Sequence, residues 1–348
     1  MVLRVVIALD ESQPSQVALK WACENTGEIA SEVHLVTVTS ADVYCAPTVP
    51  LAMGGTLDSI HAWEVQKQND LEDACRTLKQ SADLVALLGV HPDKLHKQVV
   101  TAIPGAAGVA KAVLEYAQEH HAGLLVVGSR GLGSVKRCVY SFMGLGSVSD
   151  FCATHSACPV AFVRHSSKQA DFTQGRRRVC VAIDDSEAAQ DMLRWTLDTF
   201  PHEDLTIVSV APVVPYPITD ETSAIVAAAE GQRWQQDKEE AVKLAEALCH
   251  RAERTVLAHK VPPRTVHKRA LLPEDGTSDI GAAICHDAKV HLADVVLVGS
   301  RGLGSFKRSI LSLVGLGSVS EYVAHNAPCP VVICRQRTEH QGHSDPKP

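Results

Sequence analysis

The sequence predicts an α/β protein made of two tandem domains, each with a doubly wound, five-stranded parallel sheet. Two observations lead to this fold class. Short apolar runs rich in β-branched residues alternate with segments of helical periodicity, which is the pattern of a parallel sheet covered on both faces. The pattern then repeats, since Trp21 returns as Trp195 and Trp63 as Trp234. A chain of 348 residues has room for two such domains.

The first strand is predicted at residues 4–9, a continuous apolar run that ends at Asp10. Asp10 or Ser12 can cap the helix that follows, in which Val17 and Trp21 keep helical spacing. The later elements of the first half follow in this order: strand 33–39, a Pro- and Gly-rich loop 40–57, helix 58–88, strand 95–102, helix 105–121, strand 124–127, helix 148–154 and strand 159–164.

The second half repeats these elements, beginning with an apolar strand that ends in Asp184. The repeat sets the expected division of the chain: a first domain at 1–165, a linker at 166–176, a second domain at 177–336 and a disordered polar tail at 337–348. The only basic block, 176–178, falls at this junction and is expected to be a solvated linker segment.

A glycine-rich segment, Gly-Ser-Arg-Gly-Leu-Gly-Ser, follows the fourth predicted strand at residues 128–134 and recurs without change at 299–305. Glycines let a ligand approach the backbone, and main-chain amides at a helix start point donors at an anion. Two basic pairs follow in sequence and add positive charge: Lys136, Arg137, Lys307 and Arg308. A plain tight turn is the alternative, but two copies after two buried strands favour a phosphate site.

Composition excludes several classes of function. The formal net charge of −7 argues against nucleic acid as a partner, because surfaces that bind it are strongly basic. The chain starts with an apolar strand-like run and no charged leader, and it lacks an apolar span of about 18 residues. We therefore expect a cytoplasmic protein that does not interact with membranes.

Eleven cysteines and seventeen histidines raise the question of a metal site. No Cys-x-x-Cys pair occurs, and His120 and His121 have no carboxylate or cysteine at recognised ligand spacing, so we predict no structural metal. Most cysteines lie in apolar runs, as Cys180 does, and are expected to be small buried hydrophobes. A redox role for Cys138 or Cys158 is a weaker hypothesis.

Taken together, these motifs resemble the universal stress protein family. The resemblance rests on the strand that ends in Asp10 with Ser12 after it, the glycine loop, the later Gly-Ser-Val-Ser and the closing Cys-Pro-Val strand, and it covers nearly the whole chain in two copies. It implies an adenine nucleotide alpha hydrolase-like sheet of five parallel strands with four helices, which binds ATP where the strand order reverses. It also implies that the fifth strands, 159–164 and 330–335, pair within the chain as a pseudo-dimer, and it leaves a homodimer open.

The resemblance assigns ATP, with Mg²⁺, to matching residues in each half. Asp10 and Asp184 match the family aspartate near the ribose and metal, and Val38 and Val210 match the position whose backbone meets the adenine edge. The predicted phosphate cradle and its surroundings consist of Gly128, Arg130, Gly131, Gly133, Lys136, Gly146, Ser147 and Val148 in the first half, and of Gly299, Arg301, Gly302, Gly304, Lys307, Gly317, Ser318 and Val319 in the second.

The glycine loops depart from the family motif in length. Fourteen residues separate Gly131 from Gly146, where the motif has nine, and the second half carries the same extension. The added residues lengthen the loop or add a helical turn. An alternative closure lies two residues earlier, at Gly144 and Gly315.

We predict an ATP-binding stress or signalling module with little or no turnover. Rapid hydrolysis needs a positioned base or water-orienting group, and the chain has no Gly-x-x-x-x-Gly-Lys-Ser/Thr motif and no partnered histidine or carboxylate at a strand end. Two alternatives remain: a slow ATPase, and a nucleotide-free dimerising scaffold of the same fold.

Overall fold

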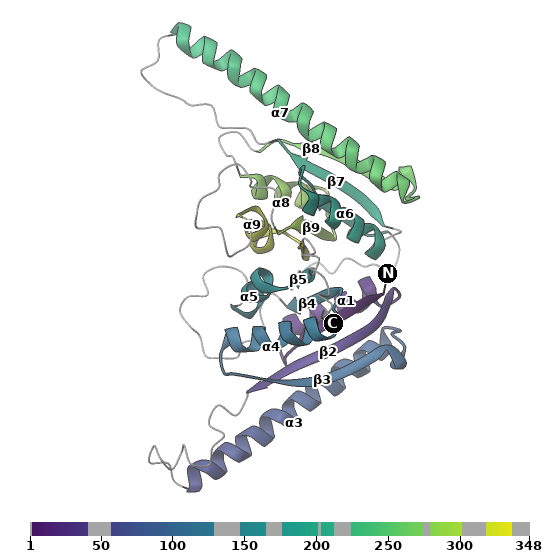
Figure 1. The fold of residues 1–348 in the computed structure, drawn as a ribbon, viewed down its shortest axis with the longest axis vertical. Helices are drawn as coiled ribbons and strands as arrows, with labels where there is room; N and C mark the ends of the chain where they lie inside the picture. The colour runs from purple at the N-terminus through teal and green to yellow at the C-terminus, as the bar shows by residue number, and fades with distance from the viewer. Residues whose placement is uncertain are drawn as a thin grey trace, which may run out of the picture.

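The computed structural model describes residues 2–40, 57–128, 147–164, 176–200, 203–211, 224–273, 279–300 and 318–335. Its strands form one ten-stranded sheet in the order β3-β2-β1-β4-β5-β10-β9-β6-β7-β8. The two long helices α3 (Leu57–Leu87) and α7 (Ala224–Ala258) lie at opposite ends of the molecule (Figure 1). Most of each glycine-rich segment, most of the expected linker and the polar tail lie outside the described residues.

The first half has the predicted alternation of strands and helices. Its elements are β1 (Leu3–Leu9), α1 (Gln13–Thr26), β2 (Ala30–Ser40), α3, the 3₁₀ turn η1 (Pro92–Lys94), β3 (Leu95–Ala102), α4 (Ala106–Glu119), β4 (Leu124–Gly128), α5 (Ser147–His155) and β5 (Val160–Val163). All pairings among its strands are parallel, in the order β3-β2-β1-β4-β5. The prediction of a doubly wound parallel sheet is confirmed.

The second half repeats this arrangement. It consists of β6 (Arg178–Ala182), α6 (Glu187–Thr199), β7 (Asp204–Val210), α7, η3 (Pro263–Thr265), β8 (Val266–Leu271), α8 (Ile280–Val290), β9 (Val295–Gly299), α9 (Ser318–Asn326) and β10 (Val331–Cys334). The order β10-β9-β6-β7-β8 is that of the first half, again with parallel pairings.

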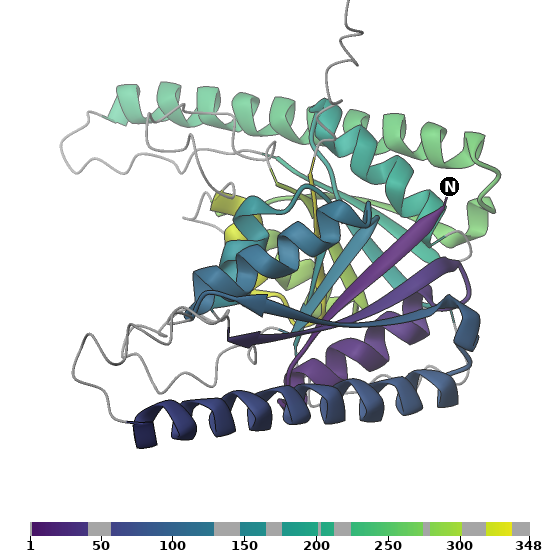
Figure 2. The same ribbon diagram turned by 60° about the horizontal axis from the view of Figure 1, so that its bottom comes forward.

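Both faces of the sheet are covered by helices, because the central strands are buried and apolar at nearly every position. In β1, Val5, Ile7 and Leu9 pack with α1 and α3, while Val6 and Ala8 pack with α4 and α5. The second half places α6 and α7 on the first of these faces and α8 and α9 on the other. Figure 2 shows the sheet between these layers. Such double burial explains the unbroken apolar runs of the sequence.

The two halves join through their fifth strands, as the family resemblance implied. β5 and β10 pair antiparallel, with Val331 opposite Phe162 and Ile333 opposite Val160. The pairing removes an exposed edge from each five-stranded sheet. The ten strands therefore form one continuous sheet within a single chain.

Element boundaries differ slightly from the prediction. β2 starts at Ala30, three residues before the predicted strand, because a register shift between Leu3 and Arg4 lets Leu3 pair with Ala30. Ser31 stabilises this extension by donating from its hydroxyl to the carbonyl oxygen of Leu3 at 2.9 Å.

Among the helices of the described residues, none combines the length and apolar character needed to cross a bilayer.

Candidate functional site

The carboxyl ends of β1 and β4 meet at the point where the strand order of the first half reverses. β1 pairs with β2 on one side and β4 on the other, and Ile7 lies opposite Val126. Asp10 directly follows β1, and Gly128 ends β4. Crevices at such switch points are where open α/β sheets bind their ligands. The second half places Asp184 and Gly299 in the same way.

Asp10 is held in a fixed orientation by the start of α1. Its Oδ1 accepts hydrogen bonds from the backbone N–H of Ser12 at 3.0 Å and from the Ser12 hydroxyl at 2.5 Å. The Ser12 Oγ also accepts from the N–H of Ser15 at 3.3 Å, so Ser12 is the N-cap of α1. Of the two predicted capping candidates, Ser12 caps the helix and Asp10 positions Ser12.

The second carboxylate oxygen of Asp10 accepts no hydrogen bond from the residues that the structure describes. This oxygen, Oδ2, is also buried. Burial raises the pKa of Asp10, while the hydrogen bonds from Ser12 act in the opposite direction. A buried oxygen without a partner is costly, and its presence at a strand end is typical of a site that receives a donor or cation.

The second half repeats this geometry. Asp184 Oδ1 accepts from the N–H of Ser186 at 3.1 Å and from its hydroxyl at 2.5 Å. Ser186 Oγ accepts from the N–H of Ala189 at 3.2 Å and caps α6. Within the described part of the chain, Asp184 Oδ2 is also buried without a partner. The two halves thus hold equivalent unsatisfied carboxylate oxygens.

Gly128 brings the end of β4 into close contact with the first turn of α1. A Cβ atom on Gly128 would lie 3.0 Å from the carbonyl carbon of Pro14 and 3.2 Å from the nitrogen of Ser15. The buried hydroxyl of Ser149, on α5, donates to the carbonyl oxygen of Gly128 at 2.8 Å. This bond joins the two ends of the segment 129–146, and sequence reasoning missed Ser149 although it belongs to the Gly-Ser-Val-Ser motif.

Val38 and Val210 lie near the carboxyl ends of β2 and β7, past the last residues that pair with β1 and β6, where the adenine edge was expected. The last β1–β2 pair is Leu9 with Thr37, so Val38 extends one residue past it. In the second half the last β6–β7 pair is Ala182 with Val208, two residues before Val210. On the other side both residues remain paired, Val38 with Val100 of β3 and Val210 with Leu271 of β8.

The remaining predicted site residues are only partly described. Ser147 and Ser318 are the first residues of α5 and α9, and Val148 and Val319 are buried next to them. The other predicted cradle residues lie outside the described ranges, and their role stays a prediction: Arg130, Gly131, Gly133, Lys136, Gly146, Arg301, Gly302, Gly304, Lys307 and Gly317.

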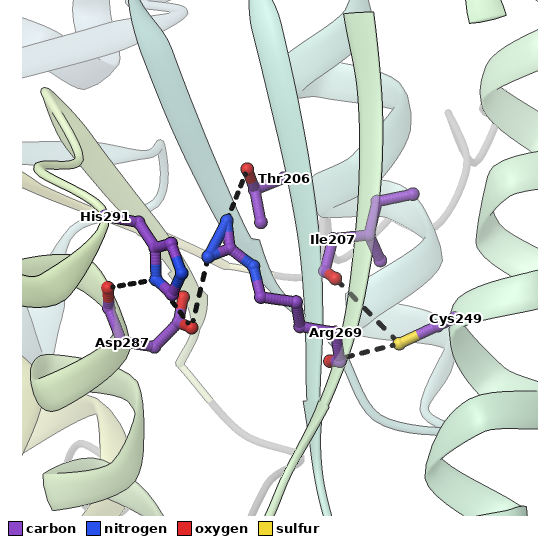
Figure 3. A network of polar contacts seen from close by, with 6 residues as sticks. All are labelled: Thr206, Ile207, Cys249, Arg269, Asp287 and His291. Atoms are coloured by element: carbon purple, nitrogen blue, oxygen red, sulfur yellow. Dashed lines mark hydrogen bonds and ion pairs between the residues drawn. The ribbon is translucent and has the colours of Figure 1, made fainter. Parts of the chain in front are cut away.

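A second polar region lies at the opposite, amino ends of the strands, on the face covered by α8. A cavity of about 480 Å³ there is lined by charged and polar side chains that include Arg178, Asp204 and His267. Within it, Arg269 donates to Thr206 at 3.2 Å and to Asp287 at 3.3 Å, and His291 lies 3.1 Å from Asp287 (Figure 3). This cavity is far from the strand ends that carry Asp184, so it is distinct from the predicted nucleotide site.

The equivalent region of the first half gathers potential metal ligands. The ligand atoms of Glu32, His34 and His96 lie within 4.8 Å of one another. Sequence reasoning did not find them, because the ligands come from two strands and meet only through the β2–β3 register, which places His34 opposite His96. Glu32 precedes the predicted strand 33–39, so the sequence pattern did not place it on the same strand as His34.

Burial makes most described cysteines poor nucleophiles. It raises the pKa of Cys158, and it raises the pKa of Cys152 to about 12. A high pKa keeps the thiol protonated and disfavours oxidation chemistry. The structure therefore gives the redox hypothesis for Cys158 no support, and Cys138 lies outside the described residues.

Comparisons with known proteins agree with the fold. The sequence profile described as "Universal stress protein family" matches residues 1–164 and 175–335. A universal stress protein of Mycobacterium tuberculosis (strain ATCC 25618 / H37Rv) is 24% identical over 347 residues, which cover 96% of this chain and 97% of that protein. One from Mycolicibacterium smegmatis is 26% identical over 341 residues, with 96% and 97% covered.

A solved structure, the crystal structure of a universal stress protein from Archaeoglobus fulgidus DSM 4304, shares the fold. It superposes with a TM-score of 0.58 at 19% identity and covers 96% of this chain and 98% of its own. Since the family profile matches two consecutive segments that together span most of the sequence, the chain belongs to the universal stress protein family.

Proposed function

We propose that this universal stress protein binds ATP with Mg²⁺ at the carboxyl ends of its strands and acts as a nucleotide-responsive stress or signalling module. One observation carries the proposal. Asp10 and Asp184 each keep a buried carboxylate oxygen without a partner among the described residues, at matching places beside the strand-order reversal. Such an oxygen accepts a hydrogen bond from a ribose hydroxyl or coordinates a divalent cation.

The neighbouring groups suit the rest of a nucleotide. Gly128 lets the end of β4 pack directly against the first turn of α1, because a Cβ atom there would lie 3.0 Å from the Pro14 backbone. The backbone beyond the β1–β2 pairing, at Val38, offers an edge for the adenine ring. The starts of α5 and α9, at Ser147 and Ser318, present helix amino ends, which favour anions such as phosphates.

Magnesium, when bound, supplies charge neutralisation of the phosphates. The residues of this chain that would hold it are Asp10 and Asp184, whose Oδ1 atoms are already engaged by Ser12 and Ser186. That engagement fixes each carboxylate plane and leaves Oδ2 for the ligand. Hydrolysis is expected to be slow, because neither aspartate has a histidine partner within hydrogen-bond distance in the described part of the chain.

Equilibrium binding of labelled ATP to the full chain, with and without Mg²⁺, tests the proposal. We expect saturable binding that requires Asp10 or Asp184, so the Asp10→Asn and Asp184→Asn variants together lose it, while each single variant keeps the other site. Recovery of intact ATP after prolonged incubation distinguishes a binder from an ATPase. Absence of saturable binding at millimolar ATP would leave the nucleotide-free scaffold as the function.

A further inference from the structure

A cluster of imidazole, carboxylate and phenol groups lies at the amino ends of the strands in the first half, on the face covered by α4. We call it the His34 cluster, and its members are Glu32, His34, His96, Tyr116 and His120. Glu32 and His34 point to the same face of β2 because they are two residues apart. His96 is opposite His34 on β3, and Tyr116 and His120 are one helical turn apart at the end of α4.

The spacing of Glu32 and His34 suits a tetrahedral ion, and His96 lies close enough to join them. Two ligand atoms held about 2.0–2.1 Å from Zn²⁺ at a tetrahedral angle are separated by about 3.3 Å. His34 Nε2 and Glu32 Oε2 are 3.2 Å apart. The His96 ring lies stacked on that of His34, with ring centres 4.6 Å apart, and it must rotate to face the ion. Because His96 is exposed on edge strand β3, it has room to do so.

Neighbouring groups hold the His34 ring in an orientation that suits metal binding. The hydroxyl of Tyr116 lies 2.9 Å from His34 Nδ1 and holds the ring with Nε2 directed at Glu32.

The second half provides a comparison at equivalent positions. Thr206 stands opposite His267 on the next strand, as His34 stands opposite His96. With threonine in place of His34, the guanidinium of Arg269 occupies this region and bridges Thr206 to Asp287 (Figure 3). The second half therefore supplies its own cation, Arg269, where the first half has the buried imidazole of His34. This difference makes the second half a natural negative control.

One cation already competes in the first half. Arg4 Nε donates to Glu32 Oε2 at 3.2 Å from a side chain that is about one-third exposed. A metal ion must displace this contact or use the other carboxylate oxygen.

Two other features favour the ion. The carboxyl end of α4 points its partial negative charge at the cluster, and the ring of His120 lies 4.9 Å from that of His34.

We propose that Glu32, His34 and His96 bind Zn²⁺, with His120 or water as the fourth ligand. Two imidazoles and a carboxylate form a ligand set typical of zinc, and Tyr116 positions His34 without touching the ion. The ion joins β2, the edge strand β3 and, through His120, the end of α4. Its expected effect is to stabilise the outer part of the first half, at the sheet edge opposite to the nucleotide site.

Competition between the chelator-treated full chain and a chromogenic zinc indicator, in buffer without nucleotide, tests the site. We expect one zinc per chain, and at least about tenfold weaker binding in His96→Gln and Glu32→Gln. His96 is exposed, so its substitution leaves the fold intact. The matched control His267→Gln keeps the wild-type affinity, and Arg4→Gln binds zinc more tightly.

Two further readouts separate a specific site from surface histidines. Co²⁺ in place of Zn²⁺ should give the visible absorption of a tetrahedral site in the wild type and in His267→Gln, but not in His96→Gln. Zinc should also raise the melting temperature of the wild type and leave that of His96→Gln unchanged. Equal zinc affinities in His96→Gln and His267→Gln, or no cobalt spectrum in the wild type, would overturn the proposal. No nucleotide is needed, so the outcome is independent of the proposed function.

Discussion

Arg335, at the end of β10, donates from its Nη2 to the carbonyl oxygen of Ala153 in the other half of the chain, at 2.8 Å. The reverse contact is present as well, because Arg164, at the end of β5, donates to the carbonyl oxygen of Ala324. Each arginine thus reaches the last turn of the helix of the opposite half, where unpaired carbonyl groups and the helix dipole favour a cation. The two halves are joined by reciprocal contacts in addition to the β5–β10 ladder.

These contacts predict that the junction contributes to stability. Arg335→Ala and Arg164→Ala should each lower the free energy of unfolding by about 1.5–3 kcal/mol, the range for hydrogen bonds that involve a charged group. Urea unfolding measures the effect. Arg76→Ala is the control, since its side chain is 61% exposed and its ion pair with Asp73 is a surface contact. A junction variant no less stable than the control would contradict the prediction.

Gly128 predicts a steric effect at the nucleotide site. In Gly128→Ala the new Cβ meets the backbone of Pro14 at 3.0 Å, and because backbone atoms cannot give way easily, we expect a loss of about 1–3 kcal/mol. Gly123→Ala is a matched control, because its one close Cβ contact would be with the flexible end of the Leu3 side chain, at 2.9 Å, while the backbone of Arg4 stays at 3.7 Å. Thermal unfolding of both variants should show the larger loss for Gly128→Ala, and equal losses would contradict the argument.

Burial predicts a clear order of thiol reactivity. Cys75 is exposed, whereas burial raises the pKa of Cys152 and of Cys285 to about 12. Alkylation of the native chain at pH 8, followed by peptide mass spectrometry, should therefore label Cys75 long before the other two. All three should react at similar rates in denaturant. Early labelling of Cys152 in the native chain would show that α5 opens readily.

The sheet could be predicted because its strands are buried on both faces and so form unbroken apolar runs. Asp10 and Asp184 could be placed because each follows such a run directly. The role of Ser12 was less readable, since Asp and Ser are equally good caps and only the geometry shows that Asp10 orients Ser12. The His34 cluster was not readable at all, because the register that places His34 opposite His96 is set by tertiary packing.

Replacing Asp10 by Asn should separate ligand binding from stability. Asparagine keeps an oxygen that can accept from Ser12 but loses the negative charge that a cation needs. Nucleotide affinity in the first half should therefore fall by about tenfold or more, the cost of losing a charge-assisted contact. Measuring it in an Asp184→Asn background isolates the first site, and unchanged affinity there would exclude Asp10 from binding.

The stability of the same pair of proteins should depend on pH with a definite sign. Burial raises the pKa of Asp10 in the folded chain above its usual value of 3.8, so the folded state takes up a proton at a higher pH than the unfolded state does. As the pH falls through the folded pKa towards 3.8, the free energy of unfolding of the wild type should rise relative to that of Asp10→Asn. This change is expected whichever of the two proteins is more stable at pH 7. All other groups are common to both proteins, so their titration cancels in the difference.

Because the Ser12 hydroxyl opposes the rise in the Asp10 pKa, Ser12→Ala should increase the stability gained on acidification. Urea unfolding between pH 7 and pH 4 measures it, and a wild type that loses stability relative to Asp10→Asn on acidification would show that the hydrogen bonds outweigh burial.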